Sequence, residues 1–168
     1  DAVFDLGGGV TATRVPMPGH TAGHCGFLIA PDGVLFLADV DLSSFGPLYS
    51  DRNASLADMR RTVETCAQIE VNAYATFHHK GTIFDRGAYL EALERYGSMM
   101  DAREARVLDL LGAGVNEVDE LVGAGVLYRP GTRPMFADDM ERAVCVKHLD
   151  DLVHRGLVEN DEAGYRLA

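Results

Sequence analysis

The seven residues Pro18–His24, with the sequence PGHTAGH, decide how this chain is interpreted. They follow the β-like run of residues 10–15, which the turn at Pro18-Gly19 breaks, so His20 is expected at a strand end. A side chain at a strand end can project into a cleft while the sheet holds its backbone. Because imidazole nitrogen is a common ligand of Zn²⁺ and related metals, the stretch predicts a metal site at the end of a sheet.

Two further candidate ligands follow apolar runs in the same way. Asp39 closes the run of residues 34–38, and the pair His78-His79 follows residues 73–77. Imidazoles and a carboxylate together form the ligand set of hydrolytic divalent-metal sites. The predicted ligands are three residues at strand ends, His20, Asp39 and His79, with Asp41 as the alternative to Asp39 and His78 as the alternative to His79.

Other polar side chains have a different interpretation. His24 is expected to be structural or to support a ligand, and His148 and His154 are expected to be ordinary surface or interface residues. Tyr49 lies in the loop of residues 46–51 and offers both a ring and a hydroxyl, so it is a candidate to line the substrate cleft. The alternative for Tyr49 is a packed position over the start of the next helix.

The order Pro-Gly-His-Thr-x-Gly-His, then Leu-Ala-Asp, then His-x-Gly resembles the metallo-β-lactamase superfamily. The resemblance implies that His20 binds one metal, Asp39 bridges two metals and His79 completes the second site. It implies a hydrolase that cleaves an ester, thioester, lactone or related bond by metal-activated water. The expected metal is Zn²⁺, one or two ions in the intact protein, with Mn²⁺ or Fe²⁺ as further options. Ala38 stands where the family usually has Gly.

The family's first motif, His-x-His-x-Asp-His, is absent from this chain. That motif supplies ligands to both metals, so the resemblance covers only the second half of an αββα sandwich. We therefore expect the C-terminal part of a longer protein, with no catalytic residue here beyond the metal ligands and no hydrolysis by these 168 residues alone. The N-terminal half of the same protein is then an expected partner. The rival interpretation is a non-catalytic module used for regulation or association.

The chain is expected to divide near residue 100. Residues 1–100 alternate strand and helix signals and are predicted to be the α/β (α+β) half-sandwich. Residues 101–168 show helical segments followed by a hairpin signal, which predicts a winged-helix-like domain. This second region holds eight Lys and Arg against fourteen Asp and Glu. A helix that enters a DNA groove is expected to be basic, so nucleic acid is not an expected partner.

The composition limits the classes of protein to which this chain can belong. The net charge is −11, and 47% of the residues are hydrophobic, which is typical of a folded chain. No apolar run approaches the roughly 18 residues that a membrane span requires. Three Cys form no disulfide framework. We expect a cytoplasmic protein that acts on a small-molecule substrate without a membrane partner, with a homo-oligomer as an option.

Overall fold

The computed structural model describes residues 2–78, 80–129 and 134–168. The chain divides into two units: residues 1–48 with 53–99, and residues 49–52 with 100–168. Each unit has a hydrophobic core of its own. No helix in the described part of the chain is long and apolar enough to cross a membrane.

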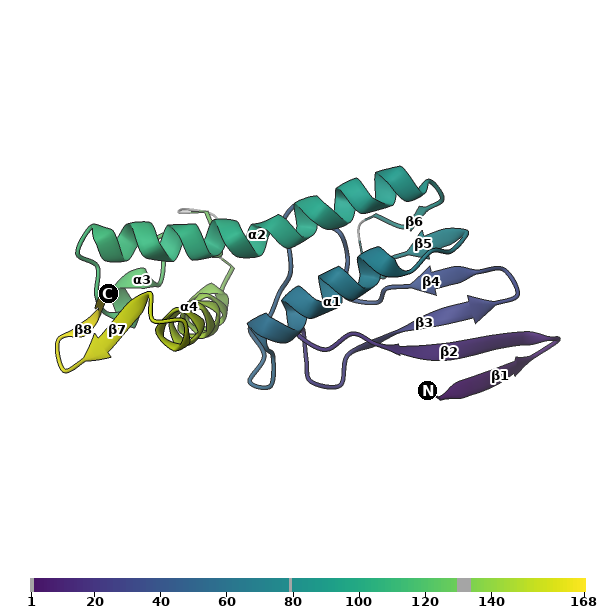
Figure 1. The fold of residues 1–168 in the computed structure, drawn as a ribbon, viewed down its shortest axis with the longest axis horizontal. Coiled ribbons are helices and arrows are strands. Elements are labelled where there is room, and N and C mark those ends of the chain that lie inside the picture. The colour runs from purple at the N-terminus through teal and green to yellow at the C-terminus, as the bar shows by residue number, and fades with distance from the viewer. Residues whose placement is uncertain (1, 79, 130–133) are drawn as a thin grey trace. The chain divides into compact units, whose positions relative to one another are not determined.

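A six-stranded sheet with the order β1-β2-β3-β4-β5-β6 forms the first unit (Figure 1). Neighbouring strands are antiparallel except for β4 and β5, which run parallel. The sheet is therefore mixed and mostly antiparallel. Its strands are β1 (Val3–Gly7), β2 (Val10–Pro16), β3 (Cys25–Ala30), β4 (Val34–Phe36), β5 (Ala73–Ala75) and β6 (Thr82–Ile83).

The predicted β3–β4 hairpin is confirmed. Its turn ends at Gly33, whose φ of +68° is a left-handed conformation that residues with a Cβ adopt at a cost. Neither β1 nor β6 was predicted as a separate strand. The two-residue strand β6 is too short to show an alternating pattern, and it forms because Tyr74 and Ala75 of β5 pair with it.

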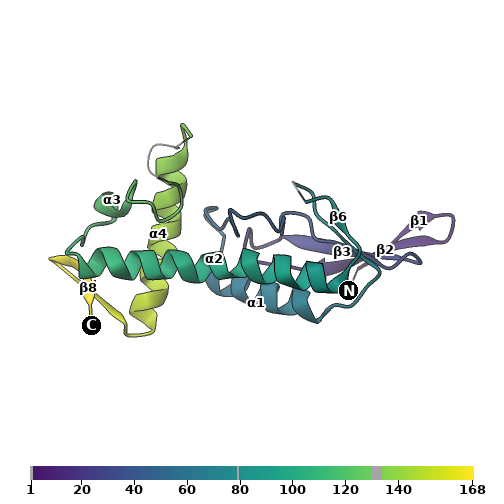
Figure 2. The same cartoon turned by 90° about the horizontal axis from the view of Figure 1, so that it is seen from above.

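Two helices cover one face of this sheet. Helix α1 (Leu56–Gln68) begins as predicted at Ser55, whose hydroxyl accepts a hydrogen bond from the Asp58 N–H at 3.1 Å. Helix α2 (Arg86–Gly112) contributes its first part to this unit and its second part to the other unit. Figures 1 and 2 both show α1 and the first part of α2 on the same side of the sheet.

The core between these helices and the sheet is apolar and aromatic. The rings of Tyr74 and Tyr89 stack at 3.6 Å between centroids, which joins β5 to α2. Arg86 donates to the Tyr74 hydroxyl at 2.8 Å and to carbonyls at the end of α1, so this buried polar end is satisfied. Alternation along the strands places Leu35 on this helix-covered face and its neighbour Phe36 on the other.

The opposite face of the sheet is apolar too, and none of the described helices covers it. We call it the open face. Phe4 and Leu6 on it are 48% and 61% exposed, which is unusual for large apolar side chains. The residues that line a shallow hollow on this face are Phe4, Leu6, Ala12, Phe27, Ile29, Val34, Phe36 and Ala75.

The second unit combines three helical segments with a two-stranded hairpin. The second part of α2 packs with α3 (Val118–Leu121) and α4 (Ala137–His154), and the strands β7 (Val158–Asp161) and β8 (Gly164–Leu167) pair antiparallel. These elements occur in the predicted order. The assignment of this unit to the winged-helix class stays a prediction.

Candidate functional site

Three strand ends meet at one end of the first unit's sheet. Strands β2 and β4 both run antiparallel to β3, and β5 runs parallel to β4. The carboxyl ends of β2, β4 and β5 therefore lie at the same end of the sheet. The segments that follow them carry His20, Asp39 and His78, which is the geometric reason why residues far apart in sequence come together here.

These three residues line one cavity of about 310 Å³. His20, Asp39 and His78 are thus brought together by the fold. His79, the first choice for the third ligand, lies outside the described residues, whereas its alternative His78 lies within them. The other residues that line the cavity are Asp41, Phe45, Gly46, Leu48 and Tyr96.

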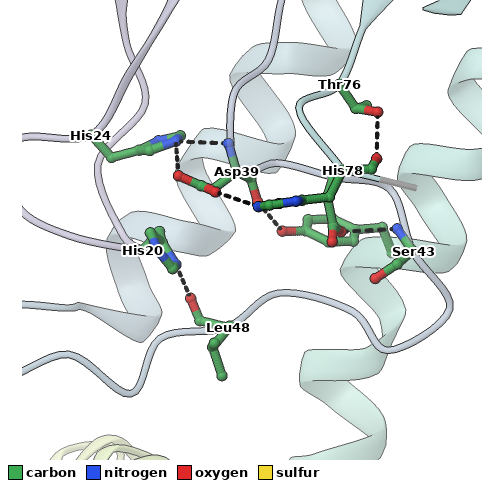
Figure 3. Close-up of polar contacts among 9 residues, drawn as sticks. His20, His24, Asp39, Ser43, Leu48, Thr76 and His78 are labelled. Carbon is green, nitrogen blue, oxygen red and sulfur yellow. Dashed lines mark hydrogen bonds and ion pairs between the residues drawn. The ribbon is translucent and has the colours of Figure 1, made fainter. Parts of the chain in front are cut away.

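Asp39 is the centre of the polar contacts (Figure 3). Its Oδ1 lies 3.4 Å from Nε2 of His78, and its Oδ2 lies 3.8 Å from Nε2 of His24. The Asp39 side chain is 39% exposed and that of His78 is 49% exposed. Both remain accessible to a ligand that enters the cavity.

His20 is oriented by a bond to the main chain. Its Nδ1 lies 2.8 Å from the carbonyl oxygen of Leu48. Because a carbonyl can only accept, Nδ1 is the donor of this bond, and Nε2 is the ring nitrogen left for another partner. This pairing of one ring nitrogen with a carbonyl is the usual arrangement of a metal-binding histidine.

His24 differs from His20 although both belong to the same heptapeptide. Its Nδ1 lies 2.7 Å from the carbonyl oxygen of Met17, and its Nε2 accepts the Asp39 N–H at 3.1 Å. Its side chain is only 6% exposed. Both ring nitrogens are engaged with the main chain, so His24 offers no lone pair to a metal.

The turn that carries His78 is held by Thr76. The Thr76 hydroxyl donates to the His78 carbonyl at 2.8 Å and lies 3.2 Å from the Gly81 carbonyl, which also accepts the Thr76 N–H. Thr76 is buried, so the bonds start from a side chain that the fold holds in place. The strand end therefore fixes the main chain of His78 at the mouth of the cavity.

Asp41, the alternative to Asp39, also lines the cavity. Its Oδ1 accepts the Ser43 N–H at 3.0 Å, a local bond that stabilises the loop after β4. The Asp39 carboxylate instead faces His78 directly. The geometry favours Asp39 as the residue that presents a carboxylate to the cavity.

The side chains that line the cavity have donor atoms of the kind that bind a divalent ion, but they are not arranged as a complete metal site. Within the described ranges, no group of three or more His, Cys, Asp or Glu side chains is arranged to hold a metal ion. Two imidazoles and a carboxylate around one cavity are nevertheless the donor chemistry of Zn²⁺ sites. The described residues therefore offer the donor atoms that such a metal binds, but they make up only part of a ligand set.

Buried thiols do not contribute a nucleophile. Burial raises the pKa of Cys66 to about 12 and, as the largest cause, that of Cys145 to about 12. Since the thiolate is the reactive form, both side chains stay protonated and inert near neutral pH.

Of the two interpretations of Tyr49, the structure favours a packed position over a place in the cleft. The side chain is fully buried in the second unit, and it does not line the cavity of His20 and Asp39. Its hydroxyl lies 2.9 Å from Nε2 of His148 and accepts a bond from Arg103 at 3.2 Å. The buried hydroxyl is satisfied by these polar partners and plays a structural part.

His148, which was expected at the surface or at an interface, is fully buried within the second unit. A signal for this was present in the helical spacing. His148 lies four residues from both Val144 and Leu152, which are buried on the same face of α4.

Tyr96 is a residue of the site that sequence reasoning missed. It lines the cavity from α2, and its hydroxyl donates to the Asp39 carbonyl at 3.3 Å. No local pattern could reveal it, because the two residues are 57 positions apart and meet only when α2 packs on the sheet.

Comparisons with known proteins address the fold. No family model and no curated protein matches this sequence. A metallo-β-lactamase family protein from Thermus thermophilus has a similar structure, with a TM-score of 0.78 and 21% identity, over 99% of this chain and 52% of that chain. A β-lactamase domain protein from Burkholderia ambifaria has a TM-score of 0.65 and 20% identity, over 99% of this chain and 50% of that chain.

The chain therefore has the fold of metallo-β-lactamase family proteins but spans only about half the length of the solved structures it matches. The prediction of a partial metallo-β-lactamase fold is confirmed. Identities of 20–21% support the fold and carry no residue roles.

Proposed function

We propose that this chain is the part of a metal-dependent hydrolase that presents His20, Asp39 and His78 or His79 to a divalent ion. The observation that carries the proposal is the convergence of an oriented imidazole, an accessible carboxylate and a second imidazole on one cavity. The fold of the solved neighbours supports a hydrolase-like protein.

The residues would take distinct parts. His20 would bind through Nε2, because Nδ1 is engaged with Leu48. Asp39 would bind through its carboxylate and would balance part of the ion's charge. When bound, an ion such as Zn²⁺, or Mn²⁺ or Fe²⁺ in its place, lowers the pKa of a bound water and polarises the scissile group. The proposed substrate is a small molecule with an ester, thioester, lactone or related bond.

The remainder of the protein is the proposed partner of this chain. The solved neighbours are about twice as long as the matched region, and the open face presents apolar side chains that a second layer could bury. In this proposal the remainder covers the open face and supplies the missing ligands. Without it, the 168 residues alone would not turn over ester, thioester or phosphodiester substrates.

Calorimetric titration with Zn²⁺ tests the metal site. The 168-residue chain should bind one Zn²⁺ weakly, and Asp39→Ala should abolish that binding because it removes the only anionic ligand proposed. Asp41→Ala is the matched control, since it removes a carboxylate from the same loop and should leave most of the affinity.

One outcome would contradict the proposed metal ligands, and another would contradict the proposed need for the remainder of the protein. Equal Zn²⁺ affinity of the chain and of Asp39→Ala would place the metal elsewhere. Metal-dependent turnover by the purified chain, lost in His20→Ala, would show that the site is complete without the remainder of the protein.

The rival function is a non-catalytic module used for association, and the open face is the observation that favours it. The titration separates the two functions. A chain that binds no Zn²⁺, alone or within the full-length protein, would support the association module.

A further inference from the structure

The main chain of Asp39 is held on both sides by side chains that come from other elements. The Asp39 N–H donates to Nε2 of His24, and the Asp39 carbonyl accepts from the Tyr96 hydroxyl. His24 directly precedes β3, and Tyr96 lies on α2. Two long-range bonds thus fix the peptide groups of a residue whose own carboxylate stays accessible in the cavity.

The partners of His24 indicate which of its ring nitrogens donates and which accepts. The Met17 carbonyl, 2.7 Å from Nδ1, can only accept, so Nδ1 is the donor. The Asp39 N–H, 3.1 Å from Nε2, can only donate, so Nε2 is the acceptor. The two bonds are therefore those of the tautomer that carries its proton on Nδ1. Its low exposure shelters both bonds from competing water.

The residue before Asp39 explains why such support is needed. Ala38 has a φ of +48°, a left-handed conformation that costs a residue with a Cβ roughly 1–2 kcal/mol. Such a conformation persists only where the surroundings hold it. The Ala38 carbonyl accepts the Phe77 N–H at 3.2 Å, and the N–H of the same peptide group, that of Asp39, donates to His24.

We propose that His24 is a positioning residue for Asp39: its ring, anchored on the Met17 carbonyl, holds the Asp39 peptide and so sets the direction of the carboxylate. This inference rests on the proposed function in that Asp39 is the anionic ligand. The bond between His24 and Asp39 exists without a metal, so that part of the inference is tested separately.

Three variants separate positioning from other roles. His24→Leu removes both hydrogen bonds while it keeps an apolar side chain in the buried place. His24→Gln retains a donor and an acceptor on one side chain and is the conservative rescue. His20→Ala removes a proposed ligand but leaves the Asp39 N–H bond in place.

The first readout is amide hydrogen exchange without metal, followed by NMR. The Asp39 amide should exchange at least about tenfold faster in His24→Leu, because the loss of a hydrogen bond worth about 1.4 kcal/mol corresponds to a tenfold change. His24→Gln should restore most of the protection, and His20→Ala should not alter it. The Leu37 amide, which donates to the Ala75 carbonyl at 2.7 Å, is the internal control and should keep its protection in all variants.

The second readout is the ¹⁵N chemical shifts of the imidazole rings during Zn²⁺ titration. His24 should show a protonated Nδ1 and an unprotonated Nε2 before and after metal is added. His20 Nε2 should shift as the metal binds. The third readout is Zn²⁺ affinity, which should fall about 10- to 100-fold in His24→Leu and recover in His24→Gln.

Each contrary result has one meaning. An Asp39 amide that stays equally protected in His24→Leu would overturn the positioning bond, and a Zn²⁺-dependent shift of His24 Nε2 like that of His20 would make His24 a ligand. If His24→Leu fails to fold, the tautomer of the unaltered chain and the His24→Gln exchange rates still decide the question. Absence of Zn²⁺ binding with the exchange results as expected would refute the proposed function and leave the bond established.

Discussion

In the first unit, polar side chains at the strand ends stay partly exposed, whereas in the second unit similar side chains are buried. Asp39 and His78 line an open cavity, but Glu141, His148 and Arg103 have at most 2% of their surface exposed. The residue types alone do not separate these two situations. What separates them is whether the fold itself uses the polar atoms.

In the second unit, the buried Glu141 carboxylate is used by the fold itself. Glu141 accepts the N–H groups of Gly123 and Leu127 at 2.8 and 2.9 Å, which holds the segment of residues 123–127. Burying a carboxylate is costly unless such bonds form. In the first unit, by contrast, His20 and Asp39 line the cavity, and the Asp39 carboxylate stays partly exposed. This arrangement leaves polar side chains accessible for chemistry.

The largest expected effect is on Glu141. Glu141→Ala leaves one buried and one partly buried N–H group without their acceptor, so it should lower the free energy of unfolding by about 3 kcal/mol. Urea denaturation followed by far-ultraviolet circular dichroism measures the change. The loss should concentrate in the amide protection of α4 and leave the strands β2–β4 protected.

Glu94→Ala is the control, since Glu94 is exposed on α2. It should shift stability by no more than about 0.5 kcal/mol. If both variants unfold at the same urea concentration, Glu141 is not the structural centre of the second unit.

The open face gives the next largest contrast between the units. Phe27 lies on this face beside Phe4, with ring centroids 6.1 Å apart. Contiguous apolar surface binds the dye ANS, so Phe27→Asp should reduce ANS fluorescence of the 168-residue chain several-fold. Leu157→Asp changes an exposed residue of the second unit and should leave the fluorescence nearly unaltered.

The same dye tests the proposed partner. The full-length protein should bind little ANS, because its remainder is proposed to cover the open face. ANS binding as strong as that of the isolated chain would refute that cover. A concentration-dependent dimer of the isolated chain, lost in Phe27→Asp, would show instead that a second copy occupies this face.

The smallest expected effects come from two alanine-to-glycine substitutions, which should change the stability in opposite directions. Ala38→Gly relieves the left-handed conformation and should stabilise the first unit by about 0.5 kcal/mol, after the greater flexibility of glycine in the unfolded chain is subtracted. Ala102→Gly, at an exposed position within α2, should destabilise by about 0.5–1 kcal/mol. Thermal unfolding measures both, and equal signs would contradict the strain assigned to Ala38.

Much of the fold could be predicted from short-range patterns in the sequence. The turn at Gly33, the cap at Ser55 and the apolar spacing of α1 are short-range features, so they were predicted from the sequence and are present. The strand β6 was missed because its pairing partner and not its own pattern defines it. The choice between the two interpretations of Tyr49 could not be made from the sequence for a similar reason, since its partners His148 and Arg103 are 99 and 54 residues away.

The sequence by itself determined the candidate residues of the site and their places after apolar runs. It also determined that these 168 residues resemble only half of a larger fold, because the His-x-His-x-Asp-His motif is absent. Tertiary structure decided which histidine does what. His20 and His24 stand four positions apart in one motif, yet one ring keeps a nitrogen for the cavity and the other engages both with the main chain. That difference arises from Leu48, Met17 and Asp39, whose peptide groups reach the two rings only when the sheet has brought its strand ends together.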